Sequence, residues 1–283
     1  MPYPTATPAT WFVTGASRGL GLELVRQLLQ RGDNVAATTR SSARMLEALT
    51  DVDVEQLLAL EIGLTDSTQV ETAVSRTVEK FGQIDVVVNN AGYGFLGAVE
   101  ETTDAEVREM FGVQVFGTWN VLRAAIPHLR QARSGHIINV SSILGLTAVP
   151  GWGLYCAGKF ALNGLTEALA GEMADHGVNV TIVEPGYFRT SFLTTESLGL
   201  PRTTSDAYPA IRDMTQNHLE LQGHQLGDPV KGAAAIIDLV VAGQGPLHQL
   251  LGSDALTYAD AKVKALTADI EAGRPLALTT DHQ

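Results

Sequence analysis

The chain has 283 residues, of which 45% are hydrophobic and 18% are charged, so it can bury the core of one large domain or two small ones. Lys and Arg number 19 and Asp and Glu number 31; the resulting net charge of −12 argues against nucleic acid or an anionic membrane as a partner. No apolar run approaches the length of a membrane span, and the start, MPYPTATPAT, lacks the pattern of a signal peptide.

Short and almost continuous apolar runs alternate with longer segments of helical periodicity. The runs are WFVT, NVAAT, LLALEI, IDVVVNN, HIINVSS, VNVTIVEP and GPLHQLLGSDA, and GLGLELVRQLLQRG and STQVETAVSRTVEKFG are typical of the helical segments. Strands that are apolar throughout are buried on both faces. The alternation therefore predicts an α/β fold, a parallel sheet with helices on both faces.

No repeat, low-complexity linker or shift in composition divides the chain, which predicts a single domain over residues 1–283. Residues 190–228 are irregular and rich in Thr, Ser, Gly and Pro, yet they carry spaced apolar side chains. A connection this long is usually functional or disordered, and the apolar spacing favours a lid over an apolar ligand. The domain then consists of a core at about 9–190, this lid, and a helix–strand–helix segment at about 229–272.

The first expected strand runs directly into TGASRGLG, residues 14–21, and then into a helix. Gly15 permits a tight turn, Gly19 lets the backbone approach a pyrophosphate, and Gly21 lets the helix pack against the strand. The free N–H groups at the start of that helix attract anions. Glycines between a strand and a helix in this order predict a dinucleotide site.

The end of the second expected strand, NVAATTRSS, bears on the choice of nucleotide. An NAD site usually carries an acid there for the adenosine ribose, but no acid occurs from Val35 to Ser42. Arg40 occupies this region instead, and Arg18 lies inside the glycine loop. Guanidinium groups bind a 2′-phosphate bidentately, which favours NADP(H). The alternative is that both Arg side chains are simply solvated.

A phenol and an ammonium group lie four residues apart in LYCAGKFAL, residues 154–162. On a helix Tyr155 and Lys159 share one face. They are either a packed Tyr beside a snorkelling Lys or a Tyr whose proton moves. Cys156, the only cysteine, fits a small buried side chain in a reducing compartment better than it fits a nucleophile. The seven His residues form no HExxH pair or Cys/His cluster, so no metal site is expected.

Five motifs in order, TGASRGLG, NNAG (89–92), NVSS (ending at Ser142), YCAGK (155–159) and EPGYFRT (184–190), resemble the classical short-chain dehydrogenase/reductase family from Trp11 to about Ala272. The resemblance implies a Rossmann-type doubly wound parallel β-sheet. It implies Tyr155 as general acid, Lys159 as the residue that binds the nicotinamide ribose and lowers the pKa of the phenol, and Ser142 as the residue that holds the substrate carbonyl.

The same resemblance assigns further contacts. Residues expected at the cofactor are Gly15, Ser17, Arg18, Gly19, Leu20, Gly21, Arg40, Leu64, Asn90, Ala91, Gly92, Tyr155, Lys159, Pro185, Gly186, Phe188 and Thr190. Residues expected at the substrate are Tyr93, Phe95, Leu144, Trp152, Leu154, Tyr187 and Phe192; each of them could equally belong to the core or the lid.

Two positions depart from the family pattern. Gln114, in GVQVFGTWN, replaces the Asn that completes the catalytic set; it either preserves a water relay to Lys159 with altered geometry or is a harmless exchange of amides. Gly63, in EIGLTD, replaces an Asp that contacts adenine, which removes an acceptor for the adenine amine.

These observations predict a cytoplasmic NADP(H)-dependent carbonyl reductase or alcohol dehydrogenase that acts on an apolar or aromatic ketone or aldehyde, or on the corresponding alcohol. Two alternatives stay open: a non-catalytic NADP-binding sensor or scaffold, and a redox-neutral epimerase or dehydratase. In the family the helix KFALNGLTEALAGEMA forms a dimer, so we expect a homodimer or homotetramer.

Overall fold

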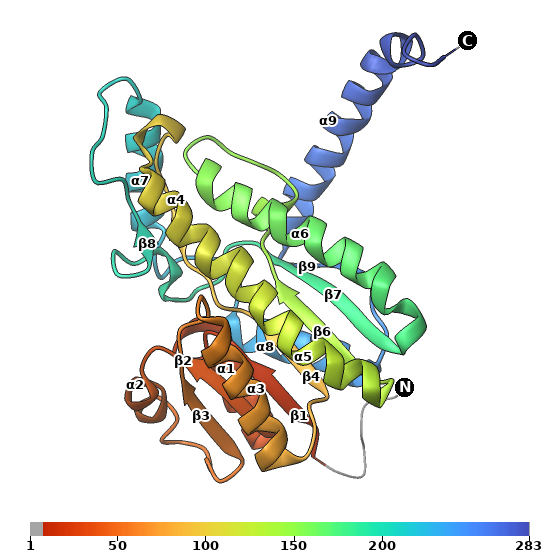
Figure 1. Cartoon of the computed structure of the whole chain (residues 1–283). Helices are drawn as coiled ribbons and strands as arrows, with labels where there is room; N and C mark the ends of the chain where they lie inside the picture. Colours follow the sequence, from red (N-terminus) through yellow and green to blue (C-terminus); the bar gives the residue numbers. More distant parts are fainter. Residues whose placement is uncertain (1–7, 283) are drawn as a thin grey trace.

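The computed structural model describes residues 8–282 as helices around one central sheet (Figure 1). Seven parallel strands form this sheet in the order β3-β2-β1-β4-β6-β7-β9. The strands are β1 (Thr10–Val13), β2 (Asn34–Thr39), β3 (Leu57–Glu61), β4 (Val86–Asn89), β6 (Gly135–Val140), β7 (Val178–Pro185) and β9 (His248–Leu251). The prediction of a single doubly wound parallel sheet is confirmed.

Helices connect the strands and cover both faces of the sheet. They are α1 (Gly19–Gln30), α2 (Ser42–Glu47), α3 (Ser67–Phe81), α4 (Asp104–Phe111), α5 (Thr118–Ala132), α6 (Gly153–Met173), α7 (Pro209–Glu220), α8 (Pro229–Ala242) and α9 (Ser253–Ala277). Short helical turns are η1 (Val99–Glu101), η3 (Ile143–Gly145), η4 (Ala174–His176) and η5 (Ser191–Leu193), and η2 (Gly112–Gly117) is a π-helix. Asp66 caps α3 and Asp228 caps α8, each by accepting two backbone N–H groups.

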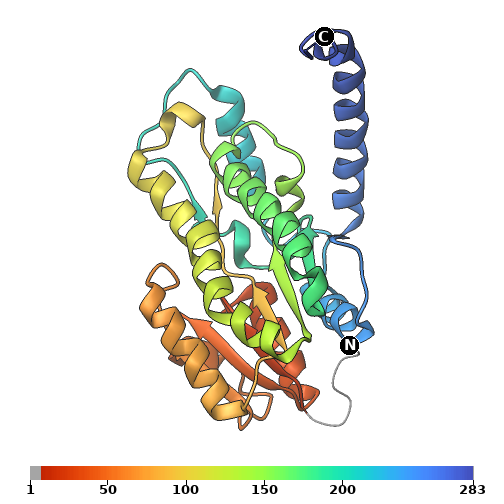
Figure 2. The ribbon, with the colours of Figure 1, turned by 45° about the vertical axis from the view of Figure 1, so that its right-hand side comes forward.

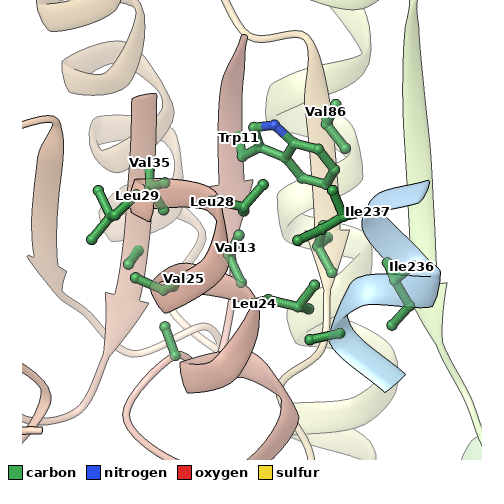
Figure 3. Packing of buried hydrophobic residues seen from close by; sticks show 14 of the residues in the cluster. Trp11, Val13, Leu24, Val25, Leu28, Leu29, Val35, Val86, Ile236 and Ile237 are labelled. Atoms are coloured by element: carbon green, nitrogen blue, oxygen red, sulfur yellow. The ribbon is translucent and has the colours of Figure 1, made fainter. Parts of the chain in front are cut away.

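Alternate residues of each strand enter separate cores, because successive side chains point to opposite faces. On one face Trp11 and Val13 of β1 pack with Leu24 of α1 and Ile237 of α8 (Figure 3). On the other face Phe12 packs in a cluster that α3, α5 and α6 complete. Strands buried on both faces explain why the sequence shows continuous apolar runs rather than alternation.

A third apolar cluster lies beyond the carboxyl edge of the sheet. It contains residues from α6, the segment after β4 and the 190–228 segment. That segment is partly ordered: it contains η5, β8 (Leu198–Gly199) and α7, and β8 pairs in parallel with β5 (Gly94–Phe95). This small second sheet ties the segment to the loop after β4, so the segment covers the edge where parallel α/β sheets bind their ligands.

The last helix, α9, leaves the body of the molecule. Figures 1 and 2 show it from two directions, and in both views its outer turns extend away from every other element. No helix in residues 8–282 combines the length and apolar character needed to cross a membrane.

Candidate active site

A cavity of about 600 Å³ lies at the carboxyl edge of the sheet, next to the neighbouring strands β1 and β4. The chain order of the strands reverses between these two, which is where doubly wound folds open a crevice for a ligand. The loops after β1, β4, β6 and β7 line the cavity, and residues 190–193 and 195–199 line its lid side.

The glycine loop forms one end of this cavity. Gly15 has φ +67°, and a Cβ atom there would lie 2.7 Å from Cα of Ala91, so the turn and the close approach both require glycine. Helix α1 begins at Gly19, so its free N–H groups are available at this end of the cavity. Asn90 joins the two loops by donating from Nδ2 to the backbone oxygens of Thr14 and Gly15.

Gly21 does not line the cavity. A Cβ atom at this position would lie 2.4 Å from Nδ2 of Asn90 and 2.5 Å from the carbonyl oxygen of Gly15. Its role is therefore the close packing of α1 against the two loops. The other sixteen residues expected at the cofactor all line the cavity; Arg40 does so directly after the end of β2.

Three arginines, Arg18, Arg40 and Arg44, lie near one another beside the glycine loop; Arg18 and Arg40 line the cavity. Burial and the nearby charges of Arg40 and Arg44 lower the pKa of Arg18. Arg40 and Arg44 are exposed, whereas Arg18 is half-buried. Glu196 of the lid, which also lines the cavity, opposes this effect on Arg18. Sequence reasoning found Arg18 and Arg40 but missed Arg44, which lies on α2 and whose charge acts on Arg18 only because the fold brings α2 to this loop.

Tyr155 lies at the other end of the cavity, on the first turn of α6. Its ring packs edge-on against Trp152 and Phe192, with centroids 5.5 and 5.8 Å away. Its hydroxyl group is hydrogen-bonded to the side chain of Ser142. Burial raises the pKa of Tyr155 above its ordinary value, and the Ser142 hydrogen bond only partly opposes this rise. The predicted fall in this pKa is therefore not found; desolvation outweighs any effect of Lys159, and the phenol is protonated at neutral pH.

Lys159 is buried one turn further along α6. Its Nζ lies 5.7 Å from the centroid of the Tyr155 ring and donates a 2.9 Å hydrogen bond to the carbonyl oxygen of Val140 at the end of β6. Burial lowers the pKa of Lys159 to about 8. Lys159 is thus fixed by the sheet rather than snorkelling to solvent.

Ser142 is fixed by the turn that follows β6. Its Oγ accepts the N–H of Leu144 and caps η3. The end of η3 is in turn held by Asn163 of α6, whose Nδ2 lies 3.1 Å from the oxygen of Gly145 and 2.7 Å from Oε1 of Glu184. Glu184 is fully buried and also contacts Nδ1 of His248. Sequence reasoning missed Asn163 and His248, because no local pattern shows that α6, β7 and β9 meet here.

Gln114 lies in the π-helix η2, a local widening that occurs often at functional sites. Its Nε2 lies 2.8 Å from the carbonyl oxygen of Tyr93 and 2.8 Å from Sδ of Met110, and its Oε1 is buried without a hydrogen-bond partner. A Cβ atom on Gly92 would lie 3.6 Å from Nζ of Lys159 and 3.9 Å from Nε2 of Gln114. The amide therefore lies near Lys159 and does not line the cavity.

Five of the seven residues expected at the substrate line the cavity: Tyr93, Leu144, Trp152, Tyr187 and Phe192. Phe95 and Leu154 do not; they are buried in the apolar cluster beside it. The structure adds Tyr258 of α9 and Leu193 of the lid to the lining. Gly63 also lines the cavity, and its N–H is bound by Oε1 of Gln69, 2.9 Å away.

Cys156 is buried on α6, and burial raises the pKa of its thiol, which fits the structural role expected for it. Within residues 8–282, no three or more His, Cys, Asp or Glu side chains are grouped so that they could hold a metal ion.

The comparisons with known proteins agree with this geometry. The family model for short chain dehydrogenases matches residues 9–199. The chain belongs to the short-chain dehydrogenase/reductase family. It is 35% identical over 271 residues to the oxidoreductase BOA17 of Botryotinia fuckeliana, covering 95% of this chain and 98% of the relative.

Two solved structures of this family are also similar. A short-chain dehydrogenase from Streptomyces avermitilis is 33% identical, with a TM-score of 0.90 over 98% of this chain and 100% of its own. A short chain dehydrogenase from Burkholderia cenocepacia in complex with NADP is 29% identical, with a TM-score of 0.72 over 94% of this chain and 97% of its own. The chain is therefore an oxidoreductase of this family, of which the Burkholderia cenocepacia member was solved with NADP.

Proposed function

We propose that the protein is an NADPH-dependent carbonyl reductase that converts an apolar or aromatic ketone or aldehyde to its alcohol, or runs the reverse reaction. One observation carries the proposal: the buried Tyr155 hydroxyl is hydrogen-bonded to Ser142 and lies one turn from Lys159, in the same cavity as the glycine loop. A proton donor and a dinucleotide cradle that share one cavity are what a hydride-transfer enzyme requires.

NADPH fits the adenosine end of the cavity because of the donor groups gathered there. Burial and the nearby charges of Arg40 and Arg44 lower the pKa of Arg18, so a phosphate dianion bound among these guanidinium groups would be stabilised by their positive charge. The loop after β2 brings no acid to the position of the ribose. When bound, NADPH would supply the hydride. Arg18 and Arg40 would hold the 2′-phosphate, the glycine loop the pyrophosphate, and Lys159 the nicotinamide ribose.

The chain's own residues account for the proton transfer. The protonated Tyr155 hydroxyl donates to the oxygen of the substrate carbonyl, and Ser142 Oγ supplies a second donor where negative charge develops on that oxygen. The positive charge of Lys159, held on the Val140 carbonyl, stabilises the phenolate that remains. Burial lowers the pKa of Lys159 only to about 8, so most Lys159 side chains are still protonated at pH 7.

The substrate class follows from the lining of the cavity beside Tyr155. Tyr93, Leu144, Trp152, Phe192 and Leu193 present aromatic and aliphatic surface there. Residues 190–228 would act as the lid, and the lid is tied to the body by Glu101, whose buried carboxylate accepts hydrogen bonds from the Ser205 N–H and from Arg212. Binding of apolar groups in this cavity would exclude water from the reacting carbonyl.

A panel of ketones and aldehydes tests the proposal. The loss of NADPH absorbance is measured with each compound and compared with the loss of NADH absorbance under the same conditions. We expect NADPH oxidation with at least one aromatic or long-chain aliphatic ketone or aldehyde. NADPH binding without turnover of any carbonyl or alcohol would favour a sensor or scaffold. Conversion of a substrate without net change in NADPH absorbance would favour an epimerase or dehydratase.

We also propose a cytoplasmic homodimer or homotetramer. Support comes from the outer face of η2, α5 and α6, where the aromatic side chains of Phe116, Trp119 and Phe160 are exposed. The α6 surface includes Gly164 and Gly171, where an added Cβ would meet nothing, so a second helix could approach closely. Sedimentation velocity on the wild type and on Trp119→Glu tests this face, because a dimer through it should dissociate in the variant.

A further inference from the structure

Helix α9 carries an apolar stripe that has no cover in residues 8–282. Only its first turns are anchored, by Ala255, which is buried, and Ala259, which packs partly against the third apolar cluster. Every residue from Val263 to Ala277 is exposed, and Figures 1 and 2 show these turns standing clear of the body. Most helical stability in proteins comes from packing an apolar face, so a free segment of this length needs a partner.

The exposed apolar side chains recur with the spacing of a coiled coil. Leu256, Val263, Leu266 and Ile270 are 55, 63, 49 and 54% exposed. Together with Ala259, Gly273 and Ala277, they occur at alternating intervals of three and four residues, which places them on one seam of the helix. The opposite side carries Ala261 and Ala268, which are not part of this seam.

We propose that this stripe is an interface with a second copy of the chain, formed by two α9 helices packed antiparallel. In one register each large side chain meets a smaller or complementary one: Leu256 faces the partner's Gly273, Ile270 faces the partner's Ala259, and Val263 faces the partner's Leu266. A parallel pair would instead put Gly273 on Gly273 and Ala259 on Ala259, leaving gaps between layers of large side chains.

The charges beside the seam select the same register. Lys262 and Asp269 flank the stripe. In the antiparallel pair Lys262 of each helix lies opposite the partner's Asp269, once on each side of the two-fold axis. In a parallel pair Lys262 would lie opposite Thr267, with no charge to meet. A helix of this length is about 37 Å long, so the tip of each α9 would reach the point where the other leaves its body. Tyr258, which lines the cavity, lies at that point.

The first test compares the sedimentation mass of the wild type with those of two matched variants. Val263→Glu/Ile270→Glu places two carboxylates on the stripe, and Ala261→Glu/Ala268→Glu places the same two on the opposite side. We expect the stripe variant to have half the mass of the wild type and the control to have the same mass as the wild type. Both pairs of sites are exposed and lie outside the cavity, so neither variant should lose NADPH binding, and the control should keep the melting temperature of the wild type. Equal masses for all three proteins would overturn the proposal.

The second test determines the direction of the pair by disulfide trapping, since the only native cysteine, Cys156, is buried. Under mild oxidation Leu256→Cys/Gly273→Cys should give a cross-linked dimer on a non-reducing gel, whereas Gly273→Cys alone should not. Cross-linking of the single variant would indicate a parallel pair. Absence of cross-linking in the double variant would show that the two α9 helices do not pair. Lys262→Asp should also weaken the association, and adding Asp269→Lys should restore it.

Discussion

The hydroxyl oxygen of Tyr187 lies 2.8 Å from Nε2 of His218, and this contact joins the loop after β7 to helix α7 of the lid. Nδ1 of His218 lies 2.8 Å from the carbonyl oxygen of Met214, so Nδ1 carries the proton and Nε2 accepts from the phenol. The ring of His218 also packs edge-on against Trp152, 5.2 Å between centroids. One hydrogen bond thus connects the expected nicotinamide side of the cavity with the cover over the substrate.

We predict that Tyr187→Phe loosens the lid without touching the proton transfer. A neutral hydrogen bond contributes about 1 kcal/mol, so KM for the carbonyl substrate should rise roughly fivefold while kcat changes little. Steady-state kinetics on Tyr187→Phe, His218→Phe and the double variant measure this. If the hydrogen bond is the cause, the double variant should be no worse than either single variant; additive losses would mean that each ring acts separately.

Tyr155→Phe removes one oxygen atom from a buried ring, so fold and NADPH binding should persist. Turnover should fall by about two or more decades, the usual contribution of a positioned general acid. Tyr93→Phe is the matched control, because it removes a phenol from the same cavity, where burial raises the pKa of Tyr93 to about 12. Nearly full activity in Tyr155→Phe would show that the assigned mechanism is wrong.

The arginine cluster leads to a prediction about cofactor choice. Arg40→Asp exchanges a phosphate clamp for a ribose acceptor, so KM for NADPH should rise and use of NADH should improve. Arg18→Ala and Arg44→Ala should shift the preference in the same direction but less, because neither leaves an acceptor behind. The ratio of kcat/KM for NADPH to that for NADH is the measurement. An unchanged ratio in Arg40→Asp would eliminate Arg40 as the discriminating residue.

The Nε2 of Gln114 donates to the carbonyl oxygen of Tyr93, and the Gln114 side chain packs beside Gly158 of α6. Gln114→Asn would withdraw the amide by one methylene, so we expect kcat and melting temperature to fall modestly while NADPH affinity stays the same. Gln114→Ala should lower both further. A rise in kcat for Gln114→Asn would instead mean that Gln serves the family's Asn role poorly, and wild-type values for Gln114→Ala would show that position 114 has no catalytic role.

His136 predicts how stability depends on pH. It is buried on β6 with Nε2 2.9 Å from Oγ1 of Thr181, and burial lowers its pKa to about 4. In the unfolded chain the pKa of this side chain is about 6.5, so above pH 6.5 neither state binds the proton and His136 does not reduce stability. Between pH 6.5 and pH 4 only the unfolded chain binds it, and the free energy of unfolding falls by up to about 3 kcal/mol. Denaturant unfolding at pH 7 and pH 5 should therefore show a drop in stability.

The variant His136→Gln should show a smaller drop between these two pH values, because it removes the titrating group. His282→Gln is the control, since His282 is exposed and should leave the drop as it is in the wild type. Equal pH dependence in the wild type and His136→Gln would assign the loss of stability to other groups.

Local sequence determined the parts of this protein that depend on neighbouring residues along the chain. Strands buried on both faces leave continuous apolar runs, glycine is required where φ is positive at Gly15, and helical spacing alone places Lys159 above Tyr155. These features are set by backbone geometry and by which side chains a strand or helix can bury, so they can be read without knowing the fold.

Tertiary structure decided everything that depends on residues distant in sequence. Arg44 joins Arg18 because α2 follows β2 at the same edge of the sheet, and Asn163 of α6 meets Glu184 of β7 because these elements pack together. The pKa of Tyr155 rises instead of falling because desolvation depends on how many groups close over the ring, Phe192 of the lid among them. Burial, unlike spacing, is a property of the whole chain, and only the folded arrangement determines it.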